Sequence, residues 1–378
     1  LFGMTVPEIV TSAVTGACAE VGAEPSAVDV ASIGAACNFS LNEQGLLAGL
    51  VAMVPGLAAR PIETVENACA TGGQAVLSVI AKLQMGLGDV GIAVGFEKMR
   101  DEEGRMDGAR IGKVLGYFSH PDEREGKVYV FPHLFAEIMR EYMAAHGATE
   151  RDLAAIASRE YANSNHHPYA QMQKVRVSLD EAAAPEGRNR YIVDGLPLKT
   201  YDCSQITDGY AGLVLATEQG LTKLGVAKAD CVEIAGWGQA TDPLRKAGRD
   251  ILRPAGAYVA MNPAYEMAGA GPDDVNVAEI HDCFTVMGAI GTEIIGKAAC
   301  GEGARYWVEG RADPKGECGI NTSGGLIAKG HPVGATGVAM IGWCAWQLLG
   351  KVPGPLQVSD PRMAATFNIG GPICASVC

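Results

Sequence analysis

The sequence predicts an α/β protein built from two similar halves. Units of strand, small-residue turn and helix occur in both halves. Apolar residues make up 48% of the 378 residues, with 49 glycines and only 6% aromatic residues. This composition is typical of globular α/β proteins rather than of disordered or fibrous chains. The length suffices for two domains or for one duplicated unit with a large core. Because the residue-level similarity between the halves is faint, the order of the elements is what suggests a duplication.

The clearest unit surrounds Cys69. β-Branched residues over 61–65 predict a short strand, apolar spacing over 76–85 predicts a helix, and the apolar run 90–95 predicts a buried strand. Cys69 lies in the turn between the first strand and the helix, where unpaired backbone N–H groups and the helix dipole favour a thiolate. The alternative is a buried cysteine that packs as a small hydrophobe. Small neighbours would let a substrate approach the backbone closely, namely Ala68, Ala70, Gly72 and Gly73.

The remaining elements before residue 200 follow the same periodicities. Helices are predicted over 6–21, 44–53, 134–146 and 149–163, and a strand end over 28–34. Residues 98–132 are rich in charge and lack sustained periodicity, which is typical of a long surface excursion. Its basic residues form either a solvated loop or a local attraction for phosphates within an acidic protein. They are Lys98, Arg100, Arg105, Arg110, Lys113, Arg124 and Lys127.

The second half repeats the pattern. Strands are predicted over 201–216, 232–238, 277–280 and 364–372, with helices over 286–295 and 338–349. His281 and Cys283 follow one of these strands, and His331 lies in a glycine-rich loop that leads into the last helix. Ligands of α/β sheets bind outside the carboxyl ends of the strands, so we expect Cys69, His281 and His331 to converge.

Charge and cysteine usage exclude several functions. A net charge of −13 disfavours binding to nucleic acid or to an acidic membrane, and no apolar run reaches transmembrane length. The 11 cysteines lack paired C-x-x-C spacing, which predicts reduced thiols in a cytoplasmic protein. We expect no metal site, because His166 with His167, and Cys374 with Cys378, lack further ligands nearby. The chain opens on Leu1 without a signal-peptide pattern, and we expect a segment to precede it.

Four motifs carry a resemblance to a known family. They are Asn67-Ala68-Cys69-Ala70-Thr71-Gly72, Ile280-His281-Asp282-Cys283-Phe284, Ser323-Gly324-Gly325 with Lys329-Gly330-His331-Pro332, and Asn368-Ile369-Gly370-Gly371. With them the chain resembles the thiolase superfamily over essentially its whole length. It is most similar to the sterol-carrier-protein-X type and its archaeal and bacterial relatives. The second and third motifs together are very specific.

The resemblance implies a fold and a domain organisation. In the thiolase fold, two duplicated βαβ-type halves form a layered α-β-α-β-α arrangement. The N-terminal half would comprise residues 1–97 and resume at 201–221, and the C-terminal half would comprise 222–378. Residues 98–200 would form a loop domain that covers the active site and contacts coenzyme A.

The resemblance also implies a chemistry. Thiolases condense two acyl-CoA molecules, or cleave a 3-oxoacyl-CoA with CoA, through an acyl-cysteine. Cys69 would carry the acyl group and His331 would accept its proton. His281 stands where many thiolases place the Asn of an Asn-Glu-Ala-Phe motif, and would hold the enolate oxygen together with His331. The backbone N–H groups of Cys69 and Gly370 would form a second oxyanion hole, and the substrate would contact Ser323, Gly324 and Gly325.

One departure from the family pattern is informative. Biosynthetic thiolases carry a second catalytic Cys where this chain has Asn368, so Cys283 is the natural replacement for proton transfer at the substrate α-carbon. The alternative for Cys283 is a buried core thiol. Cys374 and Cys378 lie beyond the motif and are interpreted as packing residues.

Partners and alternative reactions complete these expectations. Coenzyme A would be a substrate and no other cofactor is expected. The family forms homodimers or tetramers, and some relatives bind a small zinc-containing OB-fold protein. Decarboxylative condensation is disfavoured by Cys283, and retro-aldol cleavage by the presence of Cys69. A non-catalytic acyl-CoA-binding scaffold is disfavoured by the complete set of Cys69, His281, Cys283 and His331. The acyl group stays open among acetoacetyl, longer or branched, and aryl-substituted or dicarboxylic thioesters.

Overall fold

The computed structural model covers residues 1–378, and the chain divides into two compact units. The first unit comprises Leu1–Val114, Thr207–Ile234 and Pro332–Gly342, and the second comprises Leu115–Ile206, Ala235–His331 and Trp343–Cys378. Residues 98–200, predicted as one loop domain, are divided between the units after Val114. The domain limits inferred from the sequence stay a prediction.

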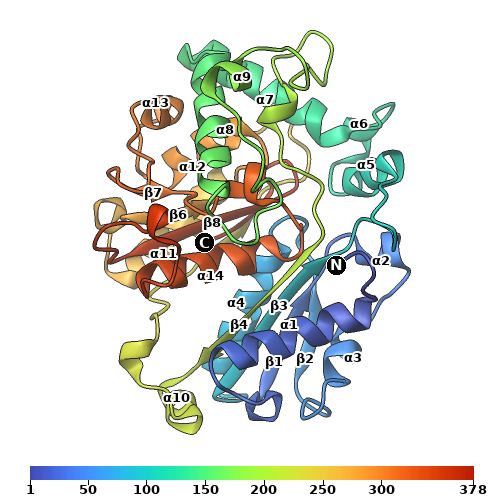
Figure 1. Ribbon diagram of the computed structural model, residues 1–378, viewed down its shortest axis with the longest axis vertical. Helices are drawn as coiled ribbons and strands as arrows, with labels where there is room; N and C mark the ends of the chain where they lie inside the picture. Colours follow the sequence, from blue (N-terminus) through green and yellow to red (C-terminus); the bar gives the residue numbers. More distant parts are fainter. The chain divides into compact units, whose positions relative to one another are not determined.

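The first unit is a four-stranded sheet with helices on both faces (Figure 1). The strands lie in the order β2-β1-β3-β4; β1 pairs in parallel with β2 and β3, and β4 runs antiparallel to β3. β1 and β3 are buried along their whole length, which explains their continuous apolar runs. The strands are β1 (Val30–Gly34), β2 (Ile62–Val65), β3 (Val90–Glu97) and β4 (Gly209–Ala216).

Helix α1 begins at a capping box, in which Thr5 and Glu8 satisfy each other's backbone N–H groups. Its apolar stripe packs on one face of the sheet together with α3, and α4 packs on the other face. The helices are α1 (Val6–Glu20), α2 (Asn38–Asn42), α3 (Leu47–Ala52), α4 (Thr71–Gln84) and α10 (Glu218–Leu224), with most of α5 (Gly108–Gly116) and the first part of α14 (Thr336–Leu348).

The second unit is a five-stranded sheet in the order β5-β9-β8-β6-β7. β6 pairs in parallel with β7 and β8, whereas β9 runs antiparallel to β5 and β8. Each unit thus contains parallel strands and the helices that follow them, and the α/β prediction is confirmed. The strands are β5 (Gln239–Thr241), β6 (Val277–Ile280), β7 (Gly319–Ile320), β8 (Ala364–Gly370) and β9 (Ala375–Val377).

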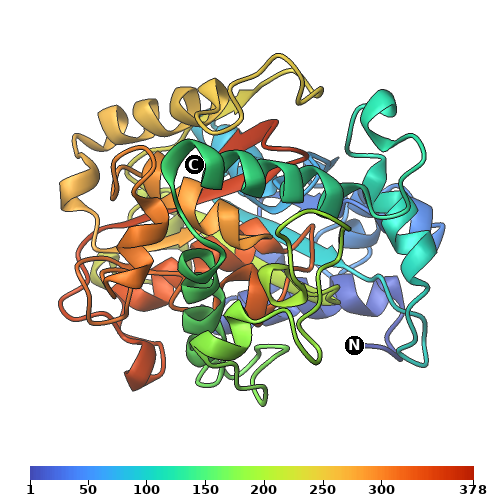
Figure 2. The same ribbon diagram turned by 90° about the horizontal axis from the view of Figure 1, so that it is seen from above.

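A fully buried helix, α12, lies at the centre of this second unit. α7, α8 and α13 pack against it (Figures 1 and 2). The helices are α6 (Pro121–Arg124), α7 (Val130–His146), α8 (Glu150–Ser164), α9 (Leu179–Ala183), α11 (Ala255–Ala268), α12 (Thr285–Ile294) and α13 (Gly303–Val308), with the last part of α14. None of the helices combines the length and the apolar character that crossing a membrane requires.

Two predictions about local structure are wrong. Residues 98–132 were expected to be irregular, yet they contain α5, in which Ile111 and Val114 are buried three residues apart. The strand expected over 232–238 does not form. Gly236 and Gly238 press against α11 instead, where an added Cβ would lie within 2.1 Å of a helix carbonyl oxygen. Pairing begins only at Gly238, which exchanges two backbone hydrogen bonds with Cys378.

Candidate active site

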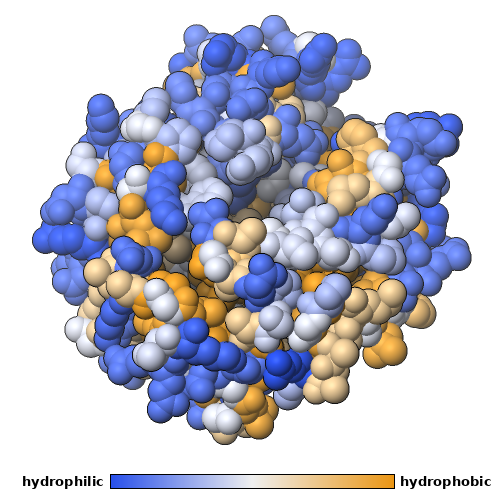
Figure 3. All heavy atoms as spheres, turned by 60° about the horizontal axis from the view of Figure 1, so that its bottom comes forward, coloured by the Kyte–Doolittle hydropathy of each residue, from blue (hydrophilic) through white to orange (hydrophobic).

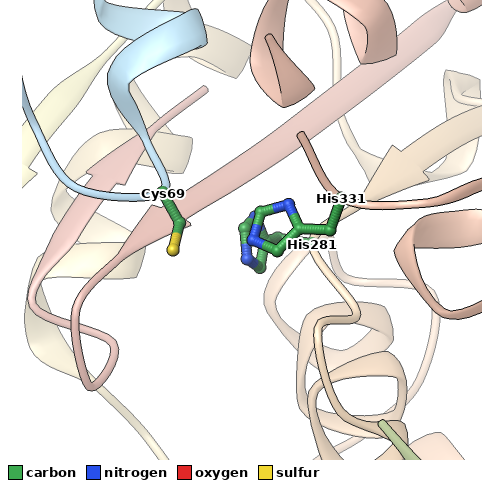
Figure 4. A group of neighbouring side chains, drawn as sticks. All are labelled: Cys69, His281 and His331. Carbon is green, nitrogen blue, oxygen red and sulfur yellow. The ribbon is translucent and has the colours of Figure 1, made fainter. Parts of the chain in front are cut away.

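Cys69 lies in a tight turn between β2 and α4, as predicted (Figure 4). The preceding Ala68 has φ +49°, a left-handed conformation that costs a non-glycine residue roughly 1–2 kcal/mol. The Thr71 hydroxyl fixes the turn, because it accepts from Asn67 N at 2.8 Å and donates to Ala68 O at 2.6 Å. The helix begins at Thr71, so Cys69 stands beside the unpaired N–H groups of its first turn. Strain held in this way is common at functional sites.

Gly72, which follows this turn, is required for close backbone packing within the protein rather than for contact with a ligand. A Cβ on Gly72 would lie 2.7 Å from the backbone nitrogen of Gly337 and 2.8 Å from that of Val338, both in the same unit. The room at Gly72 is therefore taken by the start of α14. The expectation that Gly72 makes space for a substrate is wrong.

Glu97, at the end of β3, is a buried anchor that the sequence analysis missed. Its carboxyl group accepts hydrogen bonds of 3.0 Å from the backbone N–H groups of Ala36, Cys37 and Gly334. Burial raises the pKa of Glu97 to about 7, against the effect of these hydrogen bonds. Glu97 thereby ties the loop after His331 to the end of β3. An acidic residue that closes a buried apolar strand is the signal that could have identified it.

His281 and His331 meet in the second unit, as the sequence predicted. Their rings lie 5.0 Å apart at 88° to each other (Figure 4). His281 is the first residue after β6, where its backbone N–H donates to Phe367 O on the adjacent β8 at 2.8 Å. A backbone bridge to Ile206 fixes His331. Both histidines are buried, with exposed fractions of 0% and 7%.

Both imidazoles are neutral near pH 7. Burial, together with the charge of Lys329, lowers the pKa of His331 to about 3. Burial also holds the pKa of His281 well below its usual value, with further contributions from His331 and Lys329. Lys329 in turn pairs with the buried Glu279 at 3.7 Å. A neutral histidine can accept a proton, and its protonated nitrogen can donate to a developing oxyanion.

Asn368 on β8 fixes the tautomer of His281. The amide nitrogen of Asn368 lies 2.9 Å from Nδ1 of His281. An amide nitrogen only donates, so Nδ1 accepts and Nε2 carries the proton. Nε2 of His281 is buried and has no hydrogen-bond partner within the protein. It is therefore a donor in position for a ligand oxygen.

Replacing this amide with a carboxylate tests the tautomer. In the Asn368→Asp variant, the carboxylate should accept from Nδ1–H and leave Nε2 of the neutral ring without a proton. If this Nε2–H holds a substrate oxyanion, as the resemblance implies, we expect kcat to fall roughly 10²-fold at pH 8, the usual effect of losing one oxyanion donor. The variant-to-wild-type ratio of kcat should rise as the pH is lowered, because the imidazolium regains its Nε2 proton. A ratio that is close to one at every pH would contradict the assignment.

Cys283 is held by the segment that precedes β4. Its carbonyl oxygen accepts from Ser204 N at 2.9 Å, and Phe284 forms a backbone bridge with Cys203. The Phe284 ring stacks on Phe135 of α7 at 4.5 Å. Cys283 is buried, with an exposed fraction of 8%. Its place two residues after His281 brings it to the same end of β6.

The three residues predicted to contact substrate form a tight turn. Ser323 is fully buried, and its hydroxyl donates to Glu279 at 2.6 Å. Gly324 and Gly325 have φ values of +98° and +58°, which favour glycine. Their predicted contact with substrate stays a prediction, as does the oxyanion role of Gly370, which ends β8 and pairs with Ala375.

The basic residues of the excursion are largely engaged within the protein. Lys98 is buried and donates to Phe2 O and Met4 O at 3.1 and 2.6 Å. Arg105 pairs with Asp101 and Glu103, Arg110 donates to Ser40 O and Leu41 O, and Lys127 donates to Glu123 O. Phosphate attraction through Lys98 is therefore excluded by its burial.

Comparison with known proteins agrees with these motifs. Residues 3–219 match the family description "Thiolase, N-terminal domain", and residues 238–378 match "Thiolase C-terminal domain-like". The chain is 31% identical over 371 residues to an acetyl-CoA acetyltransferase of Methanothermobacter thermautotrophicus, covering 98% of this chain and 93% of the relative. It is 30% identical over 350 residues to the benzoylsuccinyl-CoA thiolase subunit BbsB of Thauera aromatica, covering 92% and 85% of the two chains.

Solved structures share the fold. The Ltp2-ChsH2(DUF35) aldolase matches with a TM-score of 0.78 at 21% identity, over 99% of this chain and 93% of that chain. Human mitochondrial 3-ketoacyl-CoA thiolase matches with a TM-score of 0.73 at 15% identity, over 100% and 92%. The chain therefore belongs to the thiolase family and is an acyltransferase of acyl-CoA metabolism.

Proposed function

We propose that the protein cleaves a 3-oxoacyl-CoA with CoA, or runs the reverse Claisen condensation, through an acyl group carried on Cys69. The strained turn that places Cys69 at the start of α4 carries this proposal. A helix N-terminus stabilises a thiolate and makes it the stronger nucleophile. Cys69, His281, Cys283 and His331 form the proposed catalytic set, with Asn368 and Gly370 in the oxyanion sites.

In the first half-reaction His331, as general base, accepts the proton of Cys69. The thiolate attacks the thioester carbonyl of an acyl-CoA. The bond to the CoA sulfur breaks, and the departing thiolate takes up the proton from His331. The backbone N–H groups of Cys69 and Gly370 would stabilise the tetrahedral oxyanion. The result is acyl-Cys69 and free CoA.

In the second half-reaction Cys283, as thiolate, removes a proton from the α-carbon of a second acyl-CoA. The enolate oxygen is held by the Nε2–H of His281, together with His331. The α-carbon attacks the acyl carbonyl, the bond to Cys69 breaks, the Cys69 thiolate takes up the proton held by Cys283, and the 3-oxoacyl-CoA leaves. Thiolysis reverses these steps. The same groups serve both directions, since each proton taken up in one is returned in the other.

The retro-aldol reaction is the second candidate, because one structural neighbour is titled an aldolase. A retro-aldol lyase requires no acyl-carrying nucleophile. The hydrogen-bonded turn around Cys69 and the left-handed Ala68 would then serve no purpose. We therefore favour acyl transfer.

We further propose a cytoplasmic homodimer, or a tetramer of such dimers. The α2–α3 region of the first unit exposes large apolar side chains: Phe39, Leu46 and Met53 have exposed fractions of 75%, 80% and 73%. Apolar groups also interrupt the hydrophilic surface in Figure 3. Exposed apolar side chains of this size are available for burial in a protein interface. A small zinc-binding OB-fold protein is a further proposed partner, in line with a neighbour whose title names a ChsH2(DUF35) component.

A panel of 3-oxoacyl-CoA thioesters tests the function and identifies the substrate. Acetoacetyl, longer, branched, aryl-substituted and dicarboxylic thioesters would each be incubated with the protein, with and without CoA. We expect the accepted thioester to acylate the intact protein when CoA is withheld, adding the mass of the acyl fragment that remains after its α-carbon leaves as an acyl-CoA, and we expect CoA to remove this fragment. Peptide mapping should place the acyl group on Cys69. If no thioester in the panel forms an adduct, or if the adduct maps elsewhere, the proposal fails.

A further inference from the structure

Two carboxyl groups lie in contact in the interior of the second unit. Glu160 of α8 and Asp282, which follows His281, are both fully buried, and a Cβ added to Gly325 would touch both side chains, so the two carboxyl groups lie close together. Two ionised carboxylates so close in the interior would repel each other, and a hydrogen bond between them requires that one carries a hydrogen. One of the two groups is therefore protonated.

The surrounding donors show which group carries the proton. Both oxygens of Asp282 accept backbone hydrogen bonds, Oδ1 from Leu326 N at 2.8 Å and Oδ2 from Ile327 N at 3.3 Å. Oε1 of Glu160 accepts from Nδ2 of Asn321 at 2.9 Å, whereas Oε2 meets no donor. The proton thus belongs on Oε2 of Glu160, which donates to the Asp282 carboxylate. In agreement, burial and the charge of Asp282 raise the pKa of Glu160 well above its usual value.

The pair braces both segments that carry histidines. Leu326 and Ile327 belong to the turn Gly325–Lys329, which leads directly to His331. A Cβ on Gly325 would lie 2.4 Å from Cδ of Glu160 and 2.5 Å from Oδ2 of Asp282, so the turn packs directly on the pair. Asn321 extends the brace, because its Oδ1 accepts from Ile280 N, immediately before His281, at 2.7 Å.

We propose that Glu160, protonated on Oε2, and the carboxylate of Asp282 are positioning residues that hold the segments of His281 and His331 in their catalytic arrangement. The inference rests on the proposed roles of the two histidines. In this proposal, α8 contributes to the site through Glu160, which supports the segments that carry the two histidines.

Substitutions that preserve shape test which group holds the proton. In Glu160→Gln the amide oxygen can accept from Asn321 and the amide N–H₂ can donate to Asp282, so the geometry survives. We expect kcat within about threefold of wild type, since each hydrogen bond is retained. In Asp282→Asn an amide donor would face a backbone N–H, and the turn must shift. A shift of about 1 Å should lower kcat roughly 10²-fold with little change in KM.

The matched control is Glu293→Gln. Glu293 is a buried carboxyl of the same unit that accepts from Tyr142 Oη at 2.6 Å and from Gly303 N at 3.0 Å. The Glu293→Gln variant should have a changed thermal unfolding temperature but an unchanged kcat per folded molecule. Equal loss of kcat in Glu160→Gln and Asp282→Asn, or wild-type kcat in Asp282→Asn, overturns the proposal.

An infrared measurement tests the proton without relying on activity. At pH 8.5 Glu97, with a pKa of about 7, is ionised. The difference spectrum between wild type and Glu160→Gln should then show the carbonyl band of a protonated carboxylic acid. If the band is present but the wild type never acylates Cys69, the proposed function fails and the proton assignment stands. If the band is absent, Glu160 is not protonated and the inference is overturned.

Discussion

Cys69→Ala should abolish turnover and acyl-enzyme formation together. The variant loses the only group to which we assign the acyl chain, so thiolysis should fall by at least about 10⁴-fold, as is usual when a catalytic nucleophile is removed. The turn itself should persist, because its hydrogen bonds come from Thr71 and the backbone rather than from the thiol. The measurement is kcat for thiolysis, combined with the intact mass after incubation with the accepted thioester.

Cys37→Ala is the control for this experiment. Cys37 belongs to the same unit, is fully buried, and lies close enough for the two thiols to interact electrostatically. Burial and the neighbouring Glu97 hold the pKa of Cys37 well above its usual value, so it is a poor nucleophile near pH 7. We expect this variant to acylate normally. Residual acylation in Cys69→Ala, or its loss in Cys37→Ala, would mean that the acyl carrier has been misassigned.

The strands and helices that could be predicted are those whose periodicity is set by burial. β1 and β3 are buried on both faces and therefore consist of continuous apolar residues. The strand wrongly predicted over 232–238 also has branched apolar residues, but Gly236 and Gly238 allow its backbone to pack on α11. Close backbone packing of this kind depends on the tertiary partner, which a local pattern does not contain.

The motifs proposed to be catalytic could be found because each is a short continuous stretch, whereas the residues that support them could not. His281 and Asn368 are 87 residues apart, and only the parallel pairing of β6 with β8 makes them neighbours. Glu160 left a partial signal, since it falls on the buried stripe of α8 with Ile156 and Ala157. A carboxyl group on an apolar stripe indicates a buried acid. Its partner, Asp282, follows only from the three-dimensional structure.

Cys283→Ala should separate the two half-reactions. In the proposed mechanism, acyl transfer to Cys69 uses His331 and the backbone N–H groups, so the variant should still form the acyl adduct from an acyl-CoA. Condensation and thiolysis both require proton transfer at the α-carbon, and they should fall roughly 10³-fold, within the range for general acid–base catalysis. The most direct readout is the exchange of the α-protons of acyl-CoA with deuterated water, which should cease in the variant.

Cys203→Ala is the matched control for Cys283→Ala. Cys203 lies on the neighbouring segment, bridged to Phe284, and its thiol donates to Lys199 O at 3.4 Å. Burial holds the pKa of Cys203 well above its usual value, so it cannot supply the thiolate, and exchange should continue in its variant. Exchange that persists in Cys283→Ala would point to another base. Cys374 is a poor substitute, because its thiol is buried and already donates to Asp242 O at 2.8 Å. The exchange rate therefore decides whether the acid–base role has moved from the C-terminal motif to the residue beside His281.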